Sequence, residues 1–208
     1  MSLNDSCKYF VLLLTLHLAG CAFTPAQHSS FNDRQIKQPL NIAPYRLIIS
    51  VHDQRMALLK GSAITTIFDI STARNGVGEA LDSGGTPRGR HAIAEKIGAG
   101  LPLGTVFENR IPTDEIVAIN TPGRWPVATR ILRLRGLEDA NQNTFDRLIY
   151  LHGSPVENLL GSPASGGCIR MRSNEIIGLF DLVEVGTEIF ISELPMDTAI
   201  ALLMASQK

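Results

Sequence analysis

The sequence lacks an excess of charge of either sign. Its 208 residues include 19 Lys and Arg against 20 Asp and Glu, which gives a formal net charge of −1. A protein that binds nucleic acid by neutralising phosphates needs a basic excess, so the composition argues against that class of function. With 44% hydrophobic and 19% charged residues, the chain is also too apolar and too neutral for a disordered protein.

Aromatic residues and long apolar runs are scarce as well. Aromatic side chains make up 6% of the chain, so a stacking platform for bases or sugars is not an obvious feature. No apolar run reaches the roughly 18 residues of a membrane-spanning helix. The length suits one compact domain and is hardly enough for two.

Cysteine is rare, and its few copies are informative. The three cysteines, Cys7, Cys21 and Cys168, cannot build a disulfide framework. Lys8, an apolar run from Tyr9 to Leu18 and the small residues before Cys21 are typical of a secretory signal. The chain is therefore expected to enter an oxidising compartment.

The end of this run, Leu18-Ala19-Gly20-Cys21, resembles the lipobox of bacterial lipoproteins. The resemblance implies a signal peptide over residues 1–20, removed by cleavage, and lipidation of Cys21. Because several acyl chains on one residue anchor stably, the resemblance also implies attachment to a membrane. The alternatives are a plain secretory signal with an incidental cysteine and a buried N-terminal helix.

Two further expectations follow for the N-terminal region. Residue 22 is Ala rather than Asp, which by resemblance to enterobacterial sorting favours the periplasmic face of the outer membrane over the inner membrane. Residues 21–43 are polar and lack periodicity, so we expect the lipidated Cys21 to be followed by a flexible tether. Cys168 would then be the single remaining thiol, either a buried small hydrophobe or a nucleophile.

From residue 44 onward the pattern is that of a mostly β protein. One domain is expected over residues 44–193, followed by a C-terminal helix within 194–208. β-Branched and apolar segments predict strands, and helical spacing of apolar residues predicts helices. The predicted strands cover residues 45–51, 54–60, 64–71, 91–97, 115–119, 130–134, 147–151 and 187–192, and the predicted helices cover 173–183 and 195–205.

The stretch from Ile149 to Met171 carries the candidate chemistry. His152 ends a predicted strand, and Cys168 follows it by 16 positions, after a loop rich in Gly, Ser and Pro. A thiol nucleophile needs a base such as imidazole, and acyl transfer needs backbone N–H groups aimed at an oxyanion. Gly166 and Gly167 offer amides with almost no side-chain bulk, and Arg170 can bind a carboxylate.

Each of these residues also has a structural interpretation. A lone Cys is more often a buried hydrophobe, a lone His at a strand end is more often on the surface, and Gly-Gly usually marks a loop. Arg170 could equally be a solvated surface charge. Their combination in a secreted protein with a single thiol favours the functional interpretation.

The same stretch resembles the L,D-transpeptidases with a YkuD-type catalytic domain. The signature of that family is His-Gly, a spacer, and Ser-His-Gly-Cys followed by an apolar residue and Asn or Arg. The resemblance covers roughly residues 45–193, and includes a Thr-Pro-x-Gly segment at Thr86–Gly89 and a helix followed by a Gly-Thr strand from Asn174 to Ile191. It implies a β-sandwich or barrel-like YkuD fold with one or two short helices.

The resemblance also implies residue roles and a substrate. The substrate would be a peptidoglycan tetrapeptide stem, which loses its terminal D-Ala and becomes a thioester that an amine acceptor from a second stem or a lipoprotein resolves. No metal and no organic cofactor are implied. The implied roles are Cys168 as nucleophile, His152 as base, the Gly153 carbonyl as orienter of the imidazole, the amides of Gly166, Gly167 and Cys168 as oxyanion hole, and Arg170, Ser165 and Tyr150 as substrate-binding residues.

One departure from the family signature leaves alternatives open. Gly166 stands where the family usually has His, which removes an imidazole beside the substrate channel and some backbone rigidity. The alternatives are an L,D-carboxypeptidase or hydrolase with the same nucleophile and a non-catalytic cell-wall-binding lipoprotein. A papain-like peptidase fits poorly, because there the Cys precedes the His.

Two chemical expectations accompany the proposed pair. We expect His152 to depress the pKa of the Cys168 thiol, as a neighbouring imidazole does in thiol enzymes. We also expect carbapenems to acylate Cys168, because in this family they mimic the carbonyl of the donor.

Overall fold

A computed structural model describes residues 45–205 of the chain. The expected signal peptide, the lipidation site at Cys21 and the expected tether all lie outside the described residues. Within residues 45–205, neither α-helix is long and apolar enough to cross a membrane.

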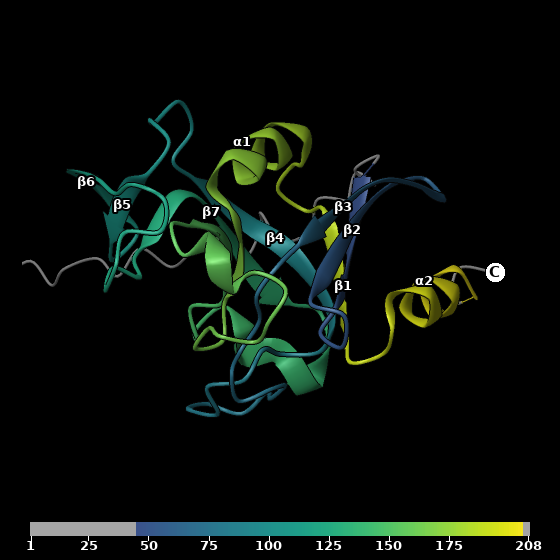
Figure 1. Cartoon of the computed structure of the whole chain (residues 1–208). Coiled ribbons are helices and arrows are strands. Elements are labelled where there is room, and N and C mark those ends of the chain that lie inside the picture. Colours follow the sequence, from purple (N-terminus) through teal and green to yellow (C-terminus); the bar gives the residue numbers. More distant parts are fainter. Residues whose placement is uncertain (1–44, 206–208) are drawn as a thin grey trace, which may run out of the picture. The chain divides into compact units, whose positions relative to one another are not determined.

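The described residues form a mostly β structure with two α-helices and two short 3₁₀ helices (Figure 1). The first half contains β1 (Tyr45–Ser50), β2 (Arg55–Lys60), β3 (Ala63–Asp69), β4 (Gly89–Ile97), β5 (Thr105–Glu108) and β6 (Ile111–Ile116). The second half contains β7 (Val127–Gly136), η2 (Asp139–Thr144), β8 (Tyr150–Ser154), η3 (Glu157–Leu159), β9 (Ile169–Arg172), α1 (Ser173–Leu182), β10 (Glu188–Ser192) and α2 (Met196–Ala205).

All ten strands belong to one mixed sheet. The order along its main path is β3-β2-β1-β10-β4-β7-β5-β6, and β8 joins at β7 and carries β9 on its other edge. Most neighbours are antiparallel, whereas β1 pairs with β10 and β8 pairs with β9 in parallel. The sheet therefore branches at β7.

The branch point at β7 decides where the candidate site lies. Ile131 of β7 pairs with Ile97 of β4 and with His152 of β8, so these two strands lie on opposite edges of β7. The β7–β8 ladder has an irregularity between Ala128 and Ile131, and Thr129 within it has a φ of 71°. A β-bulge of this kind bends a strand and redirects the side chains around it.

The two helices bury different faces of the sheet. Ile176, Leu179 and Phe180 of α1 belong to the main core, together with Leu47 and Ile49 of β1. On the opposite face, Ile48 of β1 packs with Met196, Ala199 and Leu203 of α2. Because successive side chains of a strand point to opposite faces, β1 is covered on both sides, and it reads accordingly as a continuous apolar run.

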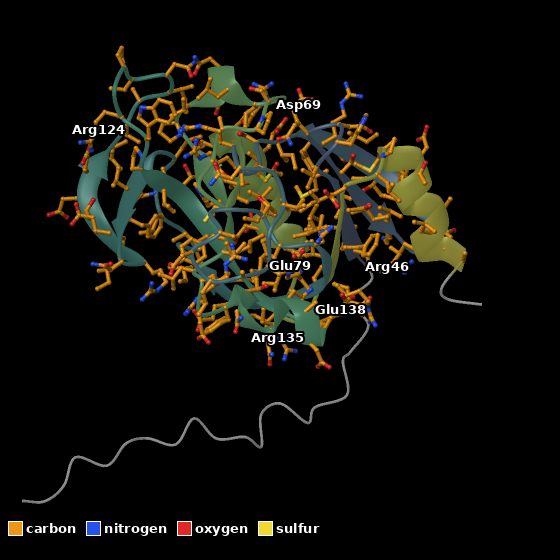
Figure 2. All side chains as sticks on the ribbon, turned by 90° about the horizontal axis from the view of Figure 1, so that it is seen from below. Arg46, Asp69, Glu79, Arg124, Arg135 and Glu138 are labelled. Atoms are coloured by element: carbon orange, nitrogen blue, oxygen red, sulfur yellow. The ribbon has the colours of Figure 1, made fainter. Side chains whose placement is uncertain are left out.

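Charged side chains lie at the periphery of this core. Figure 2 shows Arg46, Asp69, Arg124 and Arg135 at the outside of the ribbon. Arg124 forms an ion pair with Glu115 of β6, and this pair is half-exposed at both ends. Exposed pairs contribute little to stability, so the fold depends on the apolar core rather than on these ion pairs.

The fold class expected from the sequence is confirmed. The described residues are mostly β with two short α-helices, and the single sheet curls in the barrel-like manner (Figure 1). The predicted strands at 45–51, 54–60, 64–71, 91–97, 130–134 and 187–192 correspond to β1, β2, β3, β4, β7 and β10, and the predicted helices correspond to α1 and α2.

Three details of the predicted elements are wrong. The strand predicted at 147–151 begins at Tyr150 instead, because Leu148 has a φ of 57° and residues 145–148 form turns. The strand predicted at 115–119 overlaps β6 only at residues 115 and 116, because β6 spans Ile111–Ile116. β5 and β9, with four residues each, were not predicted, because such short strands show too little alternation.

Candidate active site

Strand pairing places four of the expected site residues on one face of the sheet. In the parallel pair, Leu151 is opposite Ile169 and His152 is opposite Arg170. Leu151 and Ile169 point into the main core, so their sequence neighbours point to the other face. On that face Cys168 packs against a cluster that contains Tyr150. The residues that share this face are Tyr150, His152, Cys168 and Arg170.

The tautomer of His152 is fixed by its neighbour. Nδ1 lies 2.8 Å from the carbonyl oxygen of Gly153, and a carbonyl can only accept, so Nδ1 carries the proton and Nε2 carries the lone pair. His152 is 3% exposed. The pKa of His152 is lowered to about 4, mainly by burial and to a smaller extent by the charge of Arg170, whereas the hydrogen bond to Gly153 acts to raise it. The imidazole is therefore neutral at pH 7.

Gly153 is required by packing as well as by its carbonyl. A Cβ at this position would lie 2.8 Å from the carbonyl oxygen of Ala128, 2.9 Å from a methyl group of Ile176 and 3.0 Å from Cβ of Thr129. The bulge in β7 thus approaches the backbone of β8 at the residue that orients His152. A side chain here would push the two strands apart and move the imidazole.

The thiol of Cys168 is half-buried and bonded to the backbone. Sγ donates to the carbonyl oxygen of Leu148 at 3.4 Å. Burial raises the pKa of the thiol, although the backbone of Tyr150 and the charges of Arg170 and Arg147 act in the opposite direction. The depressed thiol pKa expected from the sequence is therefore wrong for this structure, because sequence spacing does not reveal how much water the sulfur loses.

The loop before Cys168 is held by its own polar groups. Ser165 donates its hydroxyl to the carbonyl of Cys168 at 2.5 Å and accepts the N–H of Gly167 at 3.2 Å. Ser165 is 5% exposed. These two bonds support the loop, and the burial of Ser165 leaves little surface for the substrate contact that the resemblance implies. The Gly167 amide is directed into the loop, which leaves the amides of Gly166 and Cys168 as candidate oxyanion donors.

The structure requires glycine at position 167 but not at position 166. Gly167 has a φ of 137°, and a Cβ there would lie 3.1 Å from Ile149. Such a φ strains any residue that has a side chain. At Gly166 the backbone is ordinary and a Cβ would have nothing within 4 Å. The space beside Gly166 is open and solvent-exposed.

Arg170 forms no ion pair with an acidic side chain of the described residues, so its charge is available to bind a substrate anion. Its Nη1 donates to the carbonyl oxygen of Ala164 at 3.4 Å, and its guanidinium lies 5.7 Å from the ring centre of Trp125. Burial lowers its pKa, and Arg74 lowers it further. Two neighbouring guanidinium groups repel each other unless an anion lies between or beside them. The position suits a carboxylate.

Tyr150 is placed differently from the expected substrate-binding role. It is 7% exposed, and its hydroxyl accepts a hydrogen bond from Arg110 at 3.2 Å. Its ring belongs to the cluster against which Cys168 packs. Tyr150 therefore packs beside Cys168 and leaves little exposed surface for contact with a large substrate.

Sequence reasoning assigned no role to four residues around this site. Leu148 accepts the hydrogen bond of the Cys168 thiol, and Trp125 lies beside the guanidinium of Arg170. Thr86 bonds the loop that precedes Cys168, and the charge of Arg147 acts on the thiol. The Thr-Pro-x-Gly segment was a signal for Thr86, whereas nothing in the sequence pointed to the others. No group of three or more His, Cys, Asp or Glu side chains able to hold a metal ion occurs within residues 45–205.

Comparison with known proteins identifies the family. A profile of the YkuD-type L,D-transpeptidase catalytic domain matches residues 44–191. The chain belongs to this family.

Three proteins that this L,D-transpeptidase family member resembles differ widely from it in sequence. The Bacillus subtilis protein YqjB, which is provisionally named an L,D-transpeptidase, is 25% identical over 157 residues, or 76% of each chain. An L,D-transpeptidase of Mycobacterium smegmatis is 16% identical with a TM-score of 0.47, over 72% of this chain and 59% of the other. For a C442S mutant of the Enterococcus faecium L,D-transpeptidase the values are 17%, 0.46, 73% and 50%.

Alanine substitutions at Gly153 and Gly166 of this L,D-transpeptidase family member test the packing around each glycine. We predict that Gly153→Ala lowers the free energy of unfolding by about 1–3 kcal/mol, because the new methyl group overpacks the β7–β8 contact. Gly166→Ala should leave stability unchanged or raise it by up to about 1 kcal/mol, because it restricts only the unfolded chain. Urea denaturation followed by circular dichroism measures both values. Equal stability of the two variants would contradict the packing described for Gly153.

The protonation state of the thiol can be measured separately. We predict that alkylation of Cys168 by iodoacetamide accelerates through pH 9 without reaching a plateau, because burial holds the thiol pKa above its usual value of 9.0. Peptide mass spectrometry assigns the label to Cys168 between pH 6 and pH 10.5, with Cys168→Ser as the blank. A plateau below pH 7 that His152→Ala abolishes would instead show a thiolate–imidazolium pair.

Proposed function

We propose that this protein is an L,D-transpeptidase that acts on peptidoglycan tetrapeptide stems through a thioester on Cys168. The observation that carries the proposal is the β8–β9 pairing, which puts His152 and Arg170 side by side and Cys168 on the same face. The residues proposed as nucleophile, base and anion-binding cation therefore share one face of the sheet. These are the groups that acyl transfer from a peptide acid requires.

The reaction can be written on these residues. Sγ of Cys168 attacks the carbonyl carbon that precedes the terminal D-Ala, and the thiol proton passes to Nε2 of His152. The oxyanion accepts hydrogen bonds from the amides of Gly166 and Cys168. The C–N bond then breaks, D-Ala leaves with the proton from His152, and the thioester remains. An acceptor amine attacks the thioester, gives its proton to His152, and releases Cys168, which recovers the proton.

Arg170 links substrate binding to the basicity of His152. Its positive charge is one cause of the low pKa of His152. A substrate carboxylate bound to the guanidinium would cancel that charge, so the imidazole would become a stronger base when the donor is in place. The half-exposed ring of Trp125, beside the guanidinium, would form one side of this subsite.

A second candidate function remains distinct from this one. The thiol donates to the Leu148 carbonyl and burial raises its pKa, which favours a resting state of low reactivity. This observation supports the alternative of a non-catalytic cell-wall-binding protein. Water in place of the amine acceptor would give an L,D-carboxypeptidase on the same residues.

The decisive test measures release of D-Ala and formation of the thioester on Cys168. We predict that the purified protein releases D-Ala from a disaccharide-tetrapeptide and forms a Cys168 thioester that intact-mass spectrometry detects, whereas Cys168→Ala does neither. Arg170→Met should raise KM for the tetrapeptide more than it lowers kcat, because it removes a ground-state contact. Arg135→Met is the control, because Arg135 is a partly exposed arginine of β7 that is not among the candidate site residues. Cross-linked dimers indicate a transpeptidase, and tripeptide alone indicates a carboxypeptidase. A folded protein with no turnover and no adduct would support the non-catalytic alternative.

We further propose that the protein is a lipoprotein anchored through Cys21 at the periplasmic face of the outer membrane. The support is the Leu18–Cys21 segment for the lipid anchor and Ala22 for the outer membrane. We predict that metabolic labelling with an alkyne analogue of palmitate marks the protein in its native host and that Cys21→Ala abolishes the label. Labelled protein should co-sediment with outer-membrane markers. Equal labelling of the variant would overturn the anchor.

A further inference from the structure

Thr86 is fully buried beside the candidate site and is none of the residues assigned a chemical role above. Its Oγ1 accepts the N–H of Ala73 at 3.0 Å and lies 2.9 Å from the carbonyl oxygen of Gly167. A carbonyl oxygen cannot donate, so the single hydroxyl proton of Thr86 is directed to Gly167. Thr86 therefore holds one definite atom of the loop that leads to Cys168.

The hydrogen bond to Gly167 determines the direction of the next amide. In a trans peptide the C=O and the following N–H point in opposite directions. Because Thr86 holds the Gly167 carbonyl, the N–H of Cys168 points away from Thr86. The β8–β9 pairing begins only at Ile169, so this amide lies outside the ladder. On the other side of the loop, Ser165 holds the N–H of Gly167 and the carbonyl of Cys168.

We propose that Thr86 is a positioning residue that aims the Cys168 N–H at the oxyanion of the acyl-transfer step. The inference rests on the proposed function and adds to it the group that sets the direction of the hole. Without the hydroxyl, the Gly167–Cys168 peptide could rotate about its flanking bonds, since glycine restrains the chain on one side only weakly.

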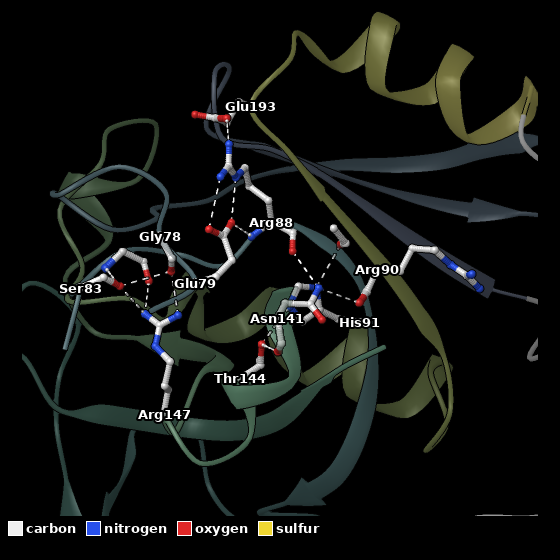
Figure 3. Close-up of polar contacts among 12 residues, drawn as sticks. Gly78, Glu79, Ser83, Arg88, Arg90, His91, Asn141, Thr144, Arg147 and Glu193 are labelled. Atoms are coloured by element: carbon white, nitrogen blue, oxygen red, sulfur yellow. Dashed lines mark hydrogen bonds and ion pairs between the residues drawn. The ribbon is translucent and has the colours of Figure 1, made fainter. Parts of the chain in front are cut away.

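Thr86 is itself held in place by a clamped loop. Arg147 donates to the carbonyls of Gly78 and Gly85 at 2.7 Å and to Oγ of Ser83 at 3.0 Å (Figure 3). The backbone N–H of Thr86 donates to the carbonyl of Gly76 at 3.0 Å. These contacts fix the backbone of Thr86 independently of its hydroxyl, so a substitution of the side chain tests the hydroxyl alone.

Two reactions of the Cys168 thiol distinguish a loss of oxyanion positioning from a general disturbance of the site. Acylation by a carbapenem forms an Sγ–C bond, opens the lactam C–N bond through a tetrahedral oxyanion and moves the thiol proton to the lactam nitrogen. Alkylation by iodoacetamide forms an Sγ–C bond, expels iodide and releases the proton to solvent, with no oxyanion. Loss of the hole therefore slows the first reaction and leaves the second unchanged.

The test compares Thr86→Val with Thr86→Ser in the full chain, with labelling of Cys168 quantified by mass spectrometry. We expect Thr86→Val to slow acylation about 10- to 100-fold at an unchanged alkylation rate, and Thr86→Ser to retain acylation. Thr105→Val is the matched control, because Thr105 is a buried threonine whose hydroxyl also donates to a backbone carbonyl, that of Pro102. If Thr86→Val does not fold, Thr86→Ala is compared with Thr86→Ser in the same way.

The outcomes distinguish this inference from the function on which it rests. An equal loss of both reactions in folded Thr86→Val, or no loss in either, would overturn the positioning role while leaving the function intact. A wild-type protein that is alkylated but never acylated, by carbapenem or by tetrapeptide, would overturn the proposed function and the inference together.

Discussion

The site depends on a single strand, β8, being paired on both of its edges. β7 pairs with it in antiparallel fashion and β9 in parallel, so β8 cannot slip without breaking two ladders at once. A shift by one residue would exchange the faces of every side chain. It would turn His152 into the core and Leu151 out of it. The apolar residues of the main core thus fix the register that holds His152 beside the loop of Cys168.

The pairing of β7 with β8 includes a strained residue, Thr129, in the β7 bulge. Thr129 is a β-branched residue with a φ of 71°, a conformation that costs free energy. Its hydroxyl accepts the amide of Gly104 at 3.0 Å, and the bulge it forms fits against Gly153 only because Gly153 has no Cβ. The strained backbone of Thr129 therefore packs directly against Gly153, the residue whose carbonyl sets the imidazole tautomer.

Much of the fold and part of the site could be predicted from the sequence, and the exceptions have physical causes. Alternation and β-branching predicted six strands closely, and helical spacing predicted both α-helices. The start of β8 was misplaced because the left-handed turn at Leu148 leaves no mark in an apolar sequence. The thiol pKa depends on burial, and the contact of Thr86 with Gly167 spans 81 positions, so neither follows from local spacing.

Gly166 is the position at which the chain departs from the family signature, and the structure limits what that departure changes. The loop is held by Ser165, by Thr86 and by backbone bonds from Ala164 and Ser165 to Thr72. None of these contacts involves a side chain at position 166. A Cβ there would meet nothing, so neither the glycine nor a larger residue is needed to shape the loop. The substitution therefore widens the open side of the site beside Cys168 and leaves the backbone that would bind the oxyanion in place.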